Sequence, residues 1–388
     1  MKIICTQENL NQGLSIVSGI AGKNPNLPIL NNVFIKAEKG KITLTTTNLE
    51  IGINCIIRGK VEKEGEFTLP AKLFYDYVNL LNKEKVEVEM KDKEIQILTS
   101  GNKTRVKGSS ADEFPSIPEI RRGNFYSVKI KDLKEAISNI IFTISSSSTR
   151  PEISGAFFYF NTKEKELIVA GTDSYRLAEK RIPIDIASGE DKKIIIPSRT
   201  LNEVLKIINL IKDDSIDEKE SKRVKIYLSE DNQILFSFPD TKMGTEDSIE
   251  LISRLIEGNY PEYHEIIPEN YNTKIIVNKK DLLNVVKTSS IFTKTGINSV
   301  KLDFLNKEKE LTVFSSSAET GENLSKVDIK IEGDNNEIKI NYKYLLDGLQ
   351  NIESDEIEIG VINKDVPCIL KPTTKNKYIY IIMPIRME

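Results

Sequence analysis

The sequence is poor in the residues on which most metal and nucleophilic sites depend. It has one histidine, His264, and three cysteines, Cys5, Cys55 and Cys368, among 388 residues. The cysteines are far apart, odd in number and in no metal-binding spacing. Such cysteines are typical of buried thiols in a reducing compartment. We therefore expect neither a metal site nor another cofactor.

The chain also lacks a surplus of positive charge. Its 55 lysines and arginines face 58 aspartates and glutamates, which gives a net charge of −3. A conventional duplex-binding protein carries a basic surplus, because phosphate neutralisation supplies most of its affinity. The composition excludes that class. The protein either does not bind nucleic acid or holds it by something other than net attraction.

Long hydrophobic runs are missing as well. No apolar stretch approaches the roughly 20 residues of a membrane-spanning helix. The residues after Met1 turn polar at once, so the apolar core of a signal peptide is not seen. Hydrophobic residues make up 39% and charged residues 29%, which is ordinary for a folded chain. These features predict a cytoplasmic protein.

What the sequence does contain is a threefold internal repeat. One set of predicted amphipathic helices covers residues 70–81, 197–208 and 341–352, whose starts lie 127 (197 − 70) and 144 (341 − 197) residues apart. In the first of them one helical face carries Leu73, Phe74, Tyr77, Val78 and Leu81. A second set of helices is expected at residues 8–17, 131–140 and 280–289, and a set of strands at 41–48, 166–173 and 310–317.

The strand patterns indicate the fold class. Residues 86–90 and 224–228 alternate between apolar and polar, as in an antiparallel sheet with one face in water. We predict an α+β protein of three repeated domains, each with two helices packed on antiparallel sheets. Proline-rich joins place the domains at residues 1–122, 123–268 and 269–388.

The repeat argues against catalysis. Ser145–Ser148 lacks the glycines of a nucleophile elbow, and no glycine-rich phosphate loop is present. Asp173 and Ser174 could serve a hydrolase, but residues 47–48 and 316–317, their counterparts in the other repeats, carry no carboxylate. One carboxylate without a partner is a weak catalytic signal. We expect a protein that is not an enzyme and keep a hydrolase acting through Asp173 and Ser174 as an alternative.

The C-terminal end is unusual for a chain of this composition. Residues 378–383 alternate as a strand, Pro384 stops it, and a short apolar tip follows. Chain termini are usually polar unless something fixes them. The tip either caps the core of its own domain or offers a deformable apolar surface to partner peptides.

Short motifs spread over the whole length resemble the bacterial DNA polymerase III beta subunit, the sliding clamp. Each motif is weak alone, but their order and spacing on a threefold repeat are specific. They include Thr172-Asp173-Ser174-Tyr175-Arg176 and the ending Met383-Pro384-Ile385-Arg386. The other motifs lie at residues 27–32, 44–50, 111–115, 149–155 and 258–263.

This resemblance implies a head-to-tail homodimer that closes a ring around double-stranded DNA without sequence preference. Such a ring tethers the replicative polymerase as a processivity factor. A ring held by topology needs only a modest basic lining, which accounts for the absent basic surplus. A non-ring protein–protein scaffold built from the same repeat is the alternative.

The resemblance further implies a pocket for linear peptides of the polymerase, the clamp loader and repair proteins. The implied peptide-binding residues are Ile153, Thr172, Ser174, Tyr175, Arg176, Leu177, Pro261, Val366, Cys368, Ile382, Met383, Pro384, Ile385 and Arg386. Many family members have histidine at the position of Tyr175 and some have arginine at that of Glu265, and Glu388 extends past the usual end. These departures bear on which peptides bind.

Two further surfaces follow from the resemblance. The implied DNA-binding residues are Lys23, Asn24, Lys72, Arg150 and Arg199. The implied dimer interface joins Lys103, Arg105 and Val106 of one chain to Ile291, Phe292, Glu319 and Glu322 of the other. It would pair opposite charges around an apolar centre.

Overall fold

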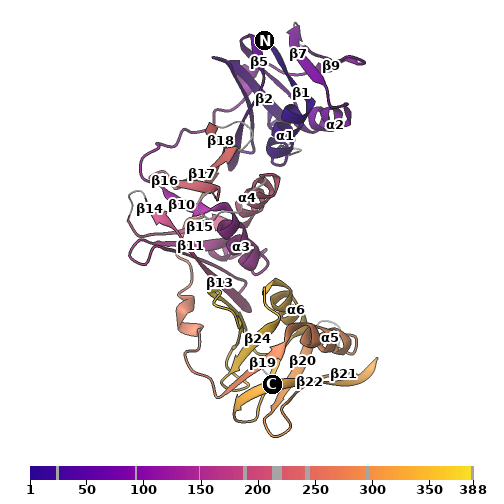
Figure 1. Cartoon of the computed structure of the whole chain (residues 1–388), viewed down its shortest axis with the longest axis vertical. Helices are drawn as coiled ribbons and strands as arrows, with labels where there is room; N and C mark the ends of the chain where they lie inside the picture. Colours follow the sequence, from indigo (N-terminus) through magenta and orange to yellow (C-terminus); the bar gives the residue numbers. More distant parts are fainter. Residues whose placement is uncertain are drawn as a thin grey trace. The chain divides into compact units, whose positions relative to one another are not determined.

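The computed structural model describes residues 1–22, 26–91, 94–147, 149–186, 190–211, 221–240, 245–293 and 297–385 (Figure 1). The chain forms two compact units. Unit 1 comprises Met1–Lys134, Ile184–Glu190 and Arg199–Leu255. Unit 2 comprises Glu135–Pro183, Asp191–Ser198 and Ile256–Glu388.

Unit 1 is built on two antiparallel sheets. The smaller has the order β5-β1-β7-β8-β9 and the larger β14-β10-β16-β17-β18-β4-β3-β2-β6. The smaller sheet consists of β1 (Lys2–Thr6), β5 (Lys60–Lys63), β7 (Lys85–Lys91), β8 (Glu94–Leu98) and β9 (Lys103–Lys107). The larger consists of β2 (Asn32–Glu38), β3 (Lys41–Thr47), β4 (Ile51–Ile57), β6 (Gly65–Pro70), β10 (Tyr126–Lys129), β14 (Asp185–Ile186), β16 (Arg223–Ser229), β17 (Gln233–Asp240) and β18 (Thr245–Arg254).

The helices of unit 1 bury one face each. α1 (Gln7–Val17) begins after Thr6, whose hydroxyl accepts a hydrogen bond from the backbone N–H of Asn9. Gly13 lets α1 approach the sheet, because a Cβ there would lie 2.4 Å from Ile57. α2 (Ala71–Leu80) packs against α1, and most of α4 (Ser198–Leu210) also belongs to this unit.

Unit 2 contains a single large antiparallel sheet of twelve strands among its described residues. Its order is β15-β11-β12-β13-β26-β25-β24-β19-β22-β21-β20-β23. The strands are β11 (Gly155–Asn161), β12 (Glu166–Thr172), β13 (Arg176–Pro183), β15 (Lys192–Pro197), β19 (Thr273–Asn278), β20 (Ser299–Leu305), β21 (Glu310–Ser317), β22 (Gly321–Gly333), β23 (Asn336–Asn341), β24 (Glu356–Val361), β25 (Cys368–Pro372) and β26 (Tyr378–Ile382).

Helices cover one face of this sheet. α5 (Lys279–Ser290) and α6 (Tyr342–Asn351) pack together, α5 against β21 and β22 and α6 against β26 (Figure 1). Asn278 and Asn341 cap their N-termini by accepting backbone hydrogen bonds. α3 (Ile130–Ile141) starts in unit 1 and ends in unit 2. Four short 3-10 helices, η1 (Pro28–Asn31), η2 (Ala111–Glu113), η3 (Pro151–Ile153) and η4 (Tyr263–Ile266), complete the described elements.

The α+β class and all six expected helices are confirmed, with local differences. α2 has Pro70 at its N-cap and no side-chain cap. Its buried face is narrower than expected, because Phe74 and Val78 are fully buried whereas Leu73 is 55% exposed. The expected strands at residues 41–48, 166–173 and 310–317 are β3, β12 and β21. All three cysteines are buried free thiols, as expected.

Each large sheet continues across one predicted domain boundary. β4 pairs with β18, Ile51 opposite Ser253, and β13 pairs with β26, Arg176 opposite Ile382. The two compact units therefore combine strands from consecutive repeats. The boundaries at 122 and 268 were placed from the repeat in the sequence. As domain boundaries they stay predictions.

Candidate functional site

The candidate site begins at a tight turn between β12 and β13. The hydroxyl of Thr172 donates to the carbonyl of Arg176 over 2.7 Å. One carboxylate oxygen of Asp173 accepts from the backbone N–H groups of Tyr175 and Arg176. Ser174 has a φ of 78°, a left-handed conformation. This conformation raises the free energy of any residue that carries a Cβ atom. This Asx-type turn holds the Tyr175 side chain out in solvent, 63% exposed.

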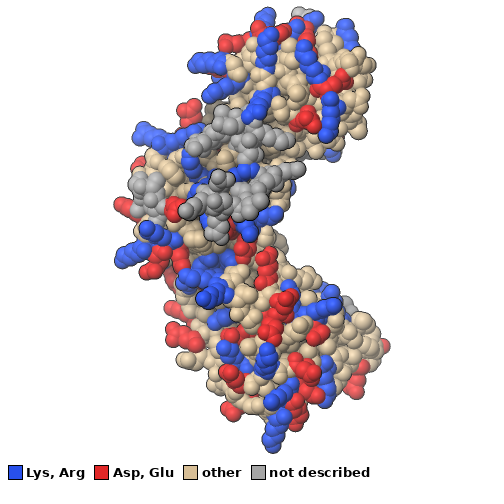
Figure 2. Space-filling model, viewed as in Figure 1, with Lys and Arg blue, Asp and Glu red and all other residues tan. Residues whose placement is uncertain are grey.

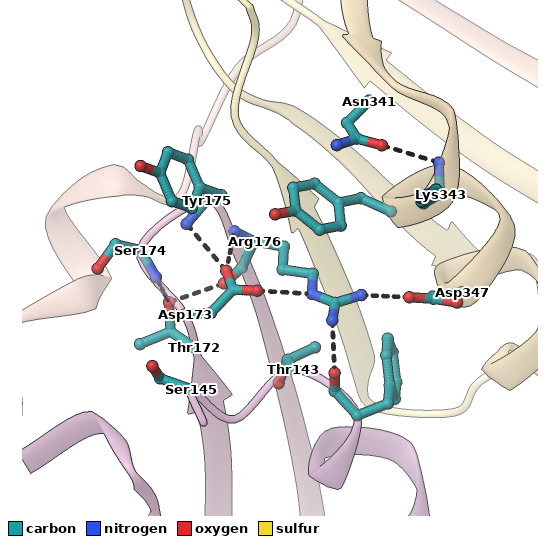
Figure 3. A network of polar contacts seen from close by, with 12 residues as sticks. Thr143, Ser145, Thr172, Asp173, Ser174, Tyr175, Arg176, Asn341, Lys343 and Asp347 are labelled. Carbon is teal, nitrogen blue, oxygen red and sulfur yellow. Dashed lines mark hydrogen bonds and ion pairs between the residues drawn. The ribbon is translucent and has the colours of Figure 1, made fainter. Parts of the chain in front are cut away.

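Arg176 ties the turn to α6 and to Phe142, the residue after α3 (Figure 3). Its Nε donates to Asp173 over 2.9 Å, one Nη to Asp347 of α6 over 2.5 Å and the other to the carbonyl of Phe142 over 2.7 Å. The guanidinium also lies 4.6 Å from the ring centroid of Tyr344. Burial alone would lower the pKa of Arg176, but Tyr380, Asp347 and Asp173 together raise it, so the group stays charged. Arg176 therefore acts as an internal clamp.

The C-terminal tail lies directly beside this turn. β26 pairs with β13, and the backbone N–H of Met383 donates to the carbonyl of Tyr175 over 2.9 Å. Two residues later, the N–H of Ile385 donates to the carbonyl of Lys339 in β23 over 2.7 Å. The tail thus bridges β13 and β23, with Met383, Pro384 and Ile385 half-buried. Arg386 lies outside the described residues.

The tail strand presents different side chains to the two faces of the sheet. Ile381 packs with Ile153 and Leu177 in one apolar cluster. Ile382 and its cross-strand partner Cys368 alternate to the opposite face and are fully buried. That face also holds Tyr380, which packs under Gly348 of α6. Cys368 and Ile382 therefore lie on the face of the sheet opposite to that of Leu177. Their expected part in peptide binding stays a prediction.

The burial of Cys368 also fixes its chemistry. Its environment raises the pKa of the thiol to about 12, so the thiol stays protonated at neutral pH. The tail strand likewise belongs to a core, because Tyr380, Ile381 and Ile382 are fully buried. The strand caps its own unit, while residues 383–385 remain partly accessible.

A segment that we call the second strap, residues 256–268, crosses the sheet beside the turn. Tyr260 and Tyr263 are buried, and the ring of Tyr260 stacks on Phe157 with centroids 5.2 Å apart. The Tyr263 hydroxyl donates to the buried carboxylate of Glu179 over 2.6 Å. Burial, and then the charge of Glu179, raise the pKa of Tyr263, so it remains a donor. Pro261 is held half-buried between these two anchors.

Glu179 is a residue that sequence reasoning missed. It is a charged side chain in a strand, only 3% exposed, and accepts from Tyr263 and, over 2.7 Å, from Nε of Arg181. His264, the single histidine, places Nδ1 3.8 Å from the same carboxylate. The sequence gives no signal for it, because a glutamate in a strand ordinarily faces water.

Comparison with known proteins assigns the chain to a family. Models of the DNA polymerase III beta subunit match residues 1–118 (N-terminal domain), 127–262 (central domain) and 264–386 (C-terminal domain). The chain is 33% identical to the beta sliding clamp of Staphylococcus epidermidis over 371 residues, 93% of this chain and 92% of the relative. The chain belongs to the DNA polymerase III beta subunit family.

Solved structures agree with this assignment. The sliding clamp of Bacillus subtilis is 26% identical with a TM-score of 0.89, and a putative beta subunit from Eubacterium rectale is 28% identical with a TM-score of 0.88. Both comparisons cover 100% of each chain. The protein is a DNA sliding clamp, a replication factor that confers processivity and is not an enzyme.

The sliding-clamp assignment agrees with the roles of Asp173 and Ser174. Both oxygens of Asp173 are engaged in holding the turn and Arg176. The Ser174 hydroxyl accepts from Arg150 over 2.9 Å. Neither residue is poised against a general base within the turn, and the hydrolase alternative is not supported. The family assignment does not favour the non-ring scaffold either.

The described residues that are expected to bind DNA belong to both compact units. Lys72 of α2 and Arg199 of α4 are exposed in unit 1. Arg150 instead lies at the turn in unit 2, bonded to Ser174 and Glu152. Lys23 and Asn24 lie outside the described residues. On the face shown in Figure 2, basic and acidic side chains are interspersed over both units.

The expected interface residues lie at strand edges and exposed ends. Lys103, Arg105 and the buried Val106 belong to β9, which pairs only with β8 among the described strands. In unit 2, Ile291 is 69% exposed at the end of α5, Phe292 is half-buried, and Glu319 and Glu322 are exposed. The first half of β22 pairs on one side, with β21, while its second half pairs with β19. Both segments therefore leave one backbone edge open.

Among the described residues, no group of three or more His, Cys, Asp or Glu side chains could hold a metal ion. Among the described helices, none is long and apolar enough to cross a membrane.

Proposed function

We propose that two copies of this clamp join head to tail into a closed ring around duplex DNA in the cytoplasm. The observation that supports it is the pair of open strand edges, β9 in unit 1 and the first half of β22 in unit 2. Joining β9 of one copy to β22 of the next would continue a sheet across the interface. A head-to-tail contact closes into a ring when its rotation permits.

The charges on these edges are complementary. Lys103 and Arg105 on β9 face outward, and Glu319 and Glu322 flank the start of β22. Ile291 and Leu324 supply exposed apolar surface near the acidic pair. Apolar contact surrounded by opposite charges is the usual anatomy of a stable interface.

Topology and charge can be tested together. We expect the wild-type protein to be a dimer at micromolar concentration, and, once loaded, to stay on a nicked circular plasmid and leave it when the plasmid is linearised. Reversing Lys103 and Arg105 to glutamate should weaken the dimer. Adding Glu319→Lys and Glu322→Lys should restore it in part. A wild-type monomer by light scattering would contradict the ring.

We further propose that partner proteins bind the surface formed by the turn at residues 172–176, the second strap and the tail. Polymerase, clamp loader and repair proteins would insert Leu or Phe side chains of linear segments there. The hydrogen bond from Met383 to Tyr175 supports this, because it sets an apolar tip against an exposed aromatic ring. Apolar walls with a few polar groups suit peptide anchors.

Deleting residues 383–388 tests the site. The deletion should lower affinity for a Leu/Phe-bearing peptide at least tenfold, because losing an anchor contact typically costs about 2 kcal/mol or more. Calorimetric titration measures the affinity and a thermal melt measures the fold. Tyr175→Ala should weaken the same peptide without changing the melt, since the ring is exposed. Unchanged affinity in the truncated protein would remove the assigned site.

A further inference from the structure

A cavity lies on the other side of the tail from Tyr175. It has a volume of 280 Å³, and Ile385 forms part of its wall. The rest of the lining comes from β20, β21, β23 and the loop before β25: Ser299, Lys301, Phe314, Ser315, Ser316, Glu337, Ile338, Lys339, Lys364 and Asp365. None of these residues belongs to the peptide surface proposed above, apart from Ile385.

The floor of the cavity is one row across three strands. Lys301 pairs with Phe314 on one side and with Lys339 on the other in the strand register. Two lysines directly opposite each other on neighbouring strands repel. The ammonium of Lys301 is neutralised by Asp303 and Glu337, each 2.8 Å away. Among the described residues neither Lys339 nor Lys364 forms an ion pair, and the exposed Asp365 is the remaining acid of the lining.

The opposite flank of the tail has the reverse charge. The second strap exposes Glu257, Glu262 and Glu265, with His264 as the one titratable base within it, and the exposed Glu269 follows it. A chain of contacts links the two flanks. Gly258 approaches Glu152, Arg150 bonds Glu152 and Ser174, Tyr175 bonds Met383, and Ile385 bonds Lys339. An acidic ligand group is repelled on the strap side and attracted on the cavity side.

We propose that this cavity binds an acidic side chain of a partner peptide, next to the apolar anchors that occupy the surface at Tyr175. Lys339 and Lys364 would pair with the carboxylate, while Phe314 and Ile385 pack against its methylene stem. This inference rests on the proposed peptide site and adds a direction to it. The acidic flank of the peptide points past Ile385, and its other flank lies along the glutamates of the strap.

Fluorescence polarisation of three labelled peptides on the full chain tests the proposal. One peptide carries Leu and Phe anchors with neutral flanks, one has two aspartates on the N-terminal flank, and one has them on the C-terminal flank. We expect one acidic peptide to bind about threefold to tenfold more tightly than the neutral one at low salt, and to lose this advantage at high salt. The other acidic peptide should bind more weakly than the neutral one.

Charge-reversed variants locate the effect. Lys339→Glu with Lys364→Glu should abolish the advantage and leave the neutral peptide unchanged. Lys330→Glu, a charge reversal at an exposed lysine of β22 outside the cavity, should leave all three affinities unchanged. An advantage that survives in the double variant, or no advantage for either acidic peptide, would overturn the inference.

Two further outcomes separate the possible causes of failure. If the neutral peptide itself does not bind, the proposed peptide site is wrong, whatever the acidic flanks do. If the neutral peptide binds but the advantage appears only after deletion of residues 386–388, the chain's own end fills the cavity and the inference is overturned.

Discussion

Two segments, the first strap and the second strap, each cross a large sheet but differ in how they are packed against it. The first strap, residues 110–120, crosses the nine-stranded sheet of unit 1, where Phe114 stacks on Phe34 of β2 at 5.3 Å and Ile117 covers Gly52 of β4. The second strap crosses the twelve-stranded sheet of unit 2 with Tyr260 and Tyr263. Both cover the place where strands from consecutive repeats pair.

The straps differ in how firmly they are held. Within the first strap only Ile120 is buried, and a cavity of 630 Å³ lies beside it, lined among others by Phe114, Ile117 and Arg122. The second strap buries two tyrosines, and one of them reaches the buried carboxylate of Glu179. Large aromatic groups with a satisfied hydroxyl hold a segment more firmly than half-buried aliphatic ones. The second strap is therefore the better support for a recognition surface.

The turns next to the straps show that a turn alone does not make a site. Thr47 bonds the carbonyl of Ile51, and Asn48 accepts from residues 50 and 51, as Thr172 and Asp173 do in unit 2. Leu49 has φ 75°, close to the 78° of Ser174. The fifth residue of the two turns differs, because Ile51 is buried whereas Arg176 bonds Asp347 of α6 and the carbonyl of Phe142, the residue after α3. The fixed strap and the arginine clamp, both specific to unit 2, favour its turn as the peptide surface.

Removing the main anchor of the second strap should give the largest effect. Tyr263→Ala deletes a buried ring and leaves Glu179 with one partner fewer. Loss of a large buried aromatic costs about 3–5 kcal/mol, so the melting temperature of the transition that includes unit 2 should fall by several degrees. Peptide affinity should fall as well, because Pro261 loses its support. Denaturant titration and calorimetric binding measure the two effects.

The matched change in the first strap is Ile117→Ala. Its side chain is half-buried, so we expect a loss of about 1 kcal/mol and no change in peptide affinity. Tyr263→Phe should fall between the two, at about 1–3 kcal/mol, because it removes only the hydroxyl from a buried carboxylate. Equal losses for Tyr263→Ala and Ile117→Ala would show that the straps are held alike.

Sequence patterns located all six helices and some of the strands. Helical periodicity located α1 to α6, alternation located β7 and β16, and extended runs that end in small polar residues located β3, β12 and β21. The alternating tail was correctly expected to be a strand. The motif at residues 172–176 was expected to lie near the tail, and the structure places them in direct hydrogen-bonded contact.

The remaining features depend on pairing between distant segments, which local patterns do not encode. Nothing in β13 indicates that Glu179 is buried until the strap with Tyr263 is placed over it. The hydrogen bonds of Arg176 to Asp347 of α6 and to the carbonyl of Phe142, the residue after α3, join segments distant in sequence, while its expected part in peptide binding stays a prediction. The joining of β4 to β18 and β13 to β26, which unites consecutive repeats, is likewise a long-range pairing. Register between distant strands is set by the whole sheet.

The smallest expected difference is between alanine substitutions at two glycines, Gly52 and Gly360. Each lies beneath a side chain that covers its sheet. A Cβ on Gly52 would lie 2.7 Å from Cδ1, 3.0 Å from Cγ2 and 3.2 Å from Cγ1 of Ile117, a half-buried side chain. A Cβ on Gly360 of β24 would lie 2.6 to 2.8 Å from three ring atoms of Tyr271, which follows the second strap. That ring is held by hydrogen bonds of its hydroxyl to the carbonyl of Pro268 and from Lys371.

The two alanine substitutions should therefore have different effects. Ile117 can shift towards the neighbouring cavity. Alanine also lowers the entropy of the unfolded chain, which raises the free energy of unfolding by about 0.4–1 kcal/mol, so Gly52→Ala should be close to neutral. Tyr271 cannot move without breaking its hydrogen bonds, so Gly360→Ala should cost about 1–3 kcal/mol. Neither glycine has a positive φ, so the backbone adds no separate penalty. Thermal melts of both variants measure the difference, and an equal loss in each would mean that the first sheet is covered as rigidly as the second.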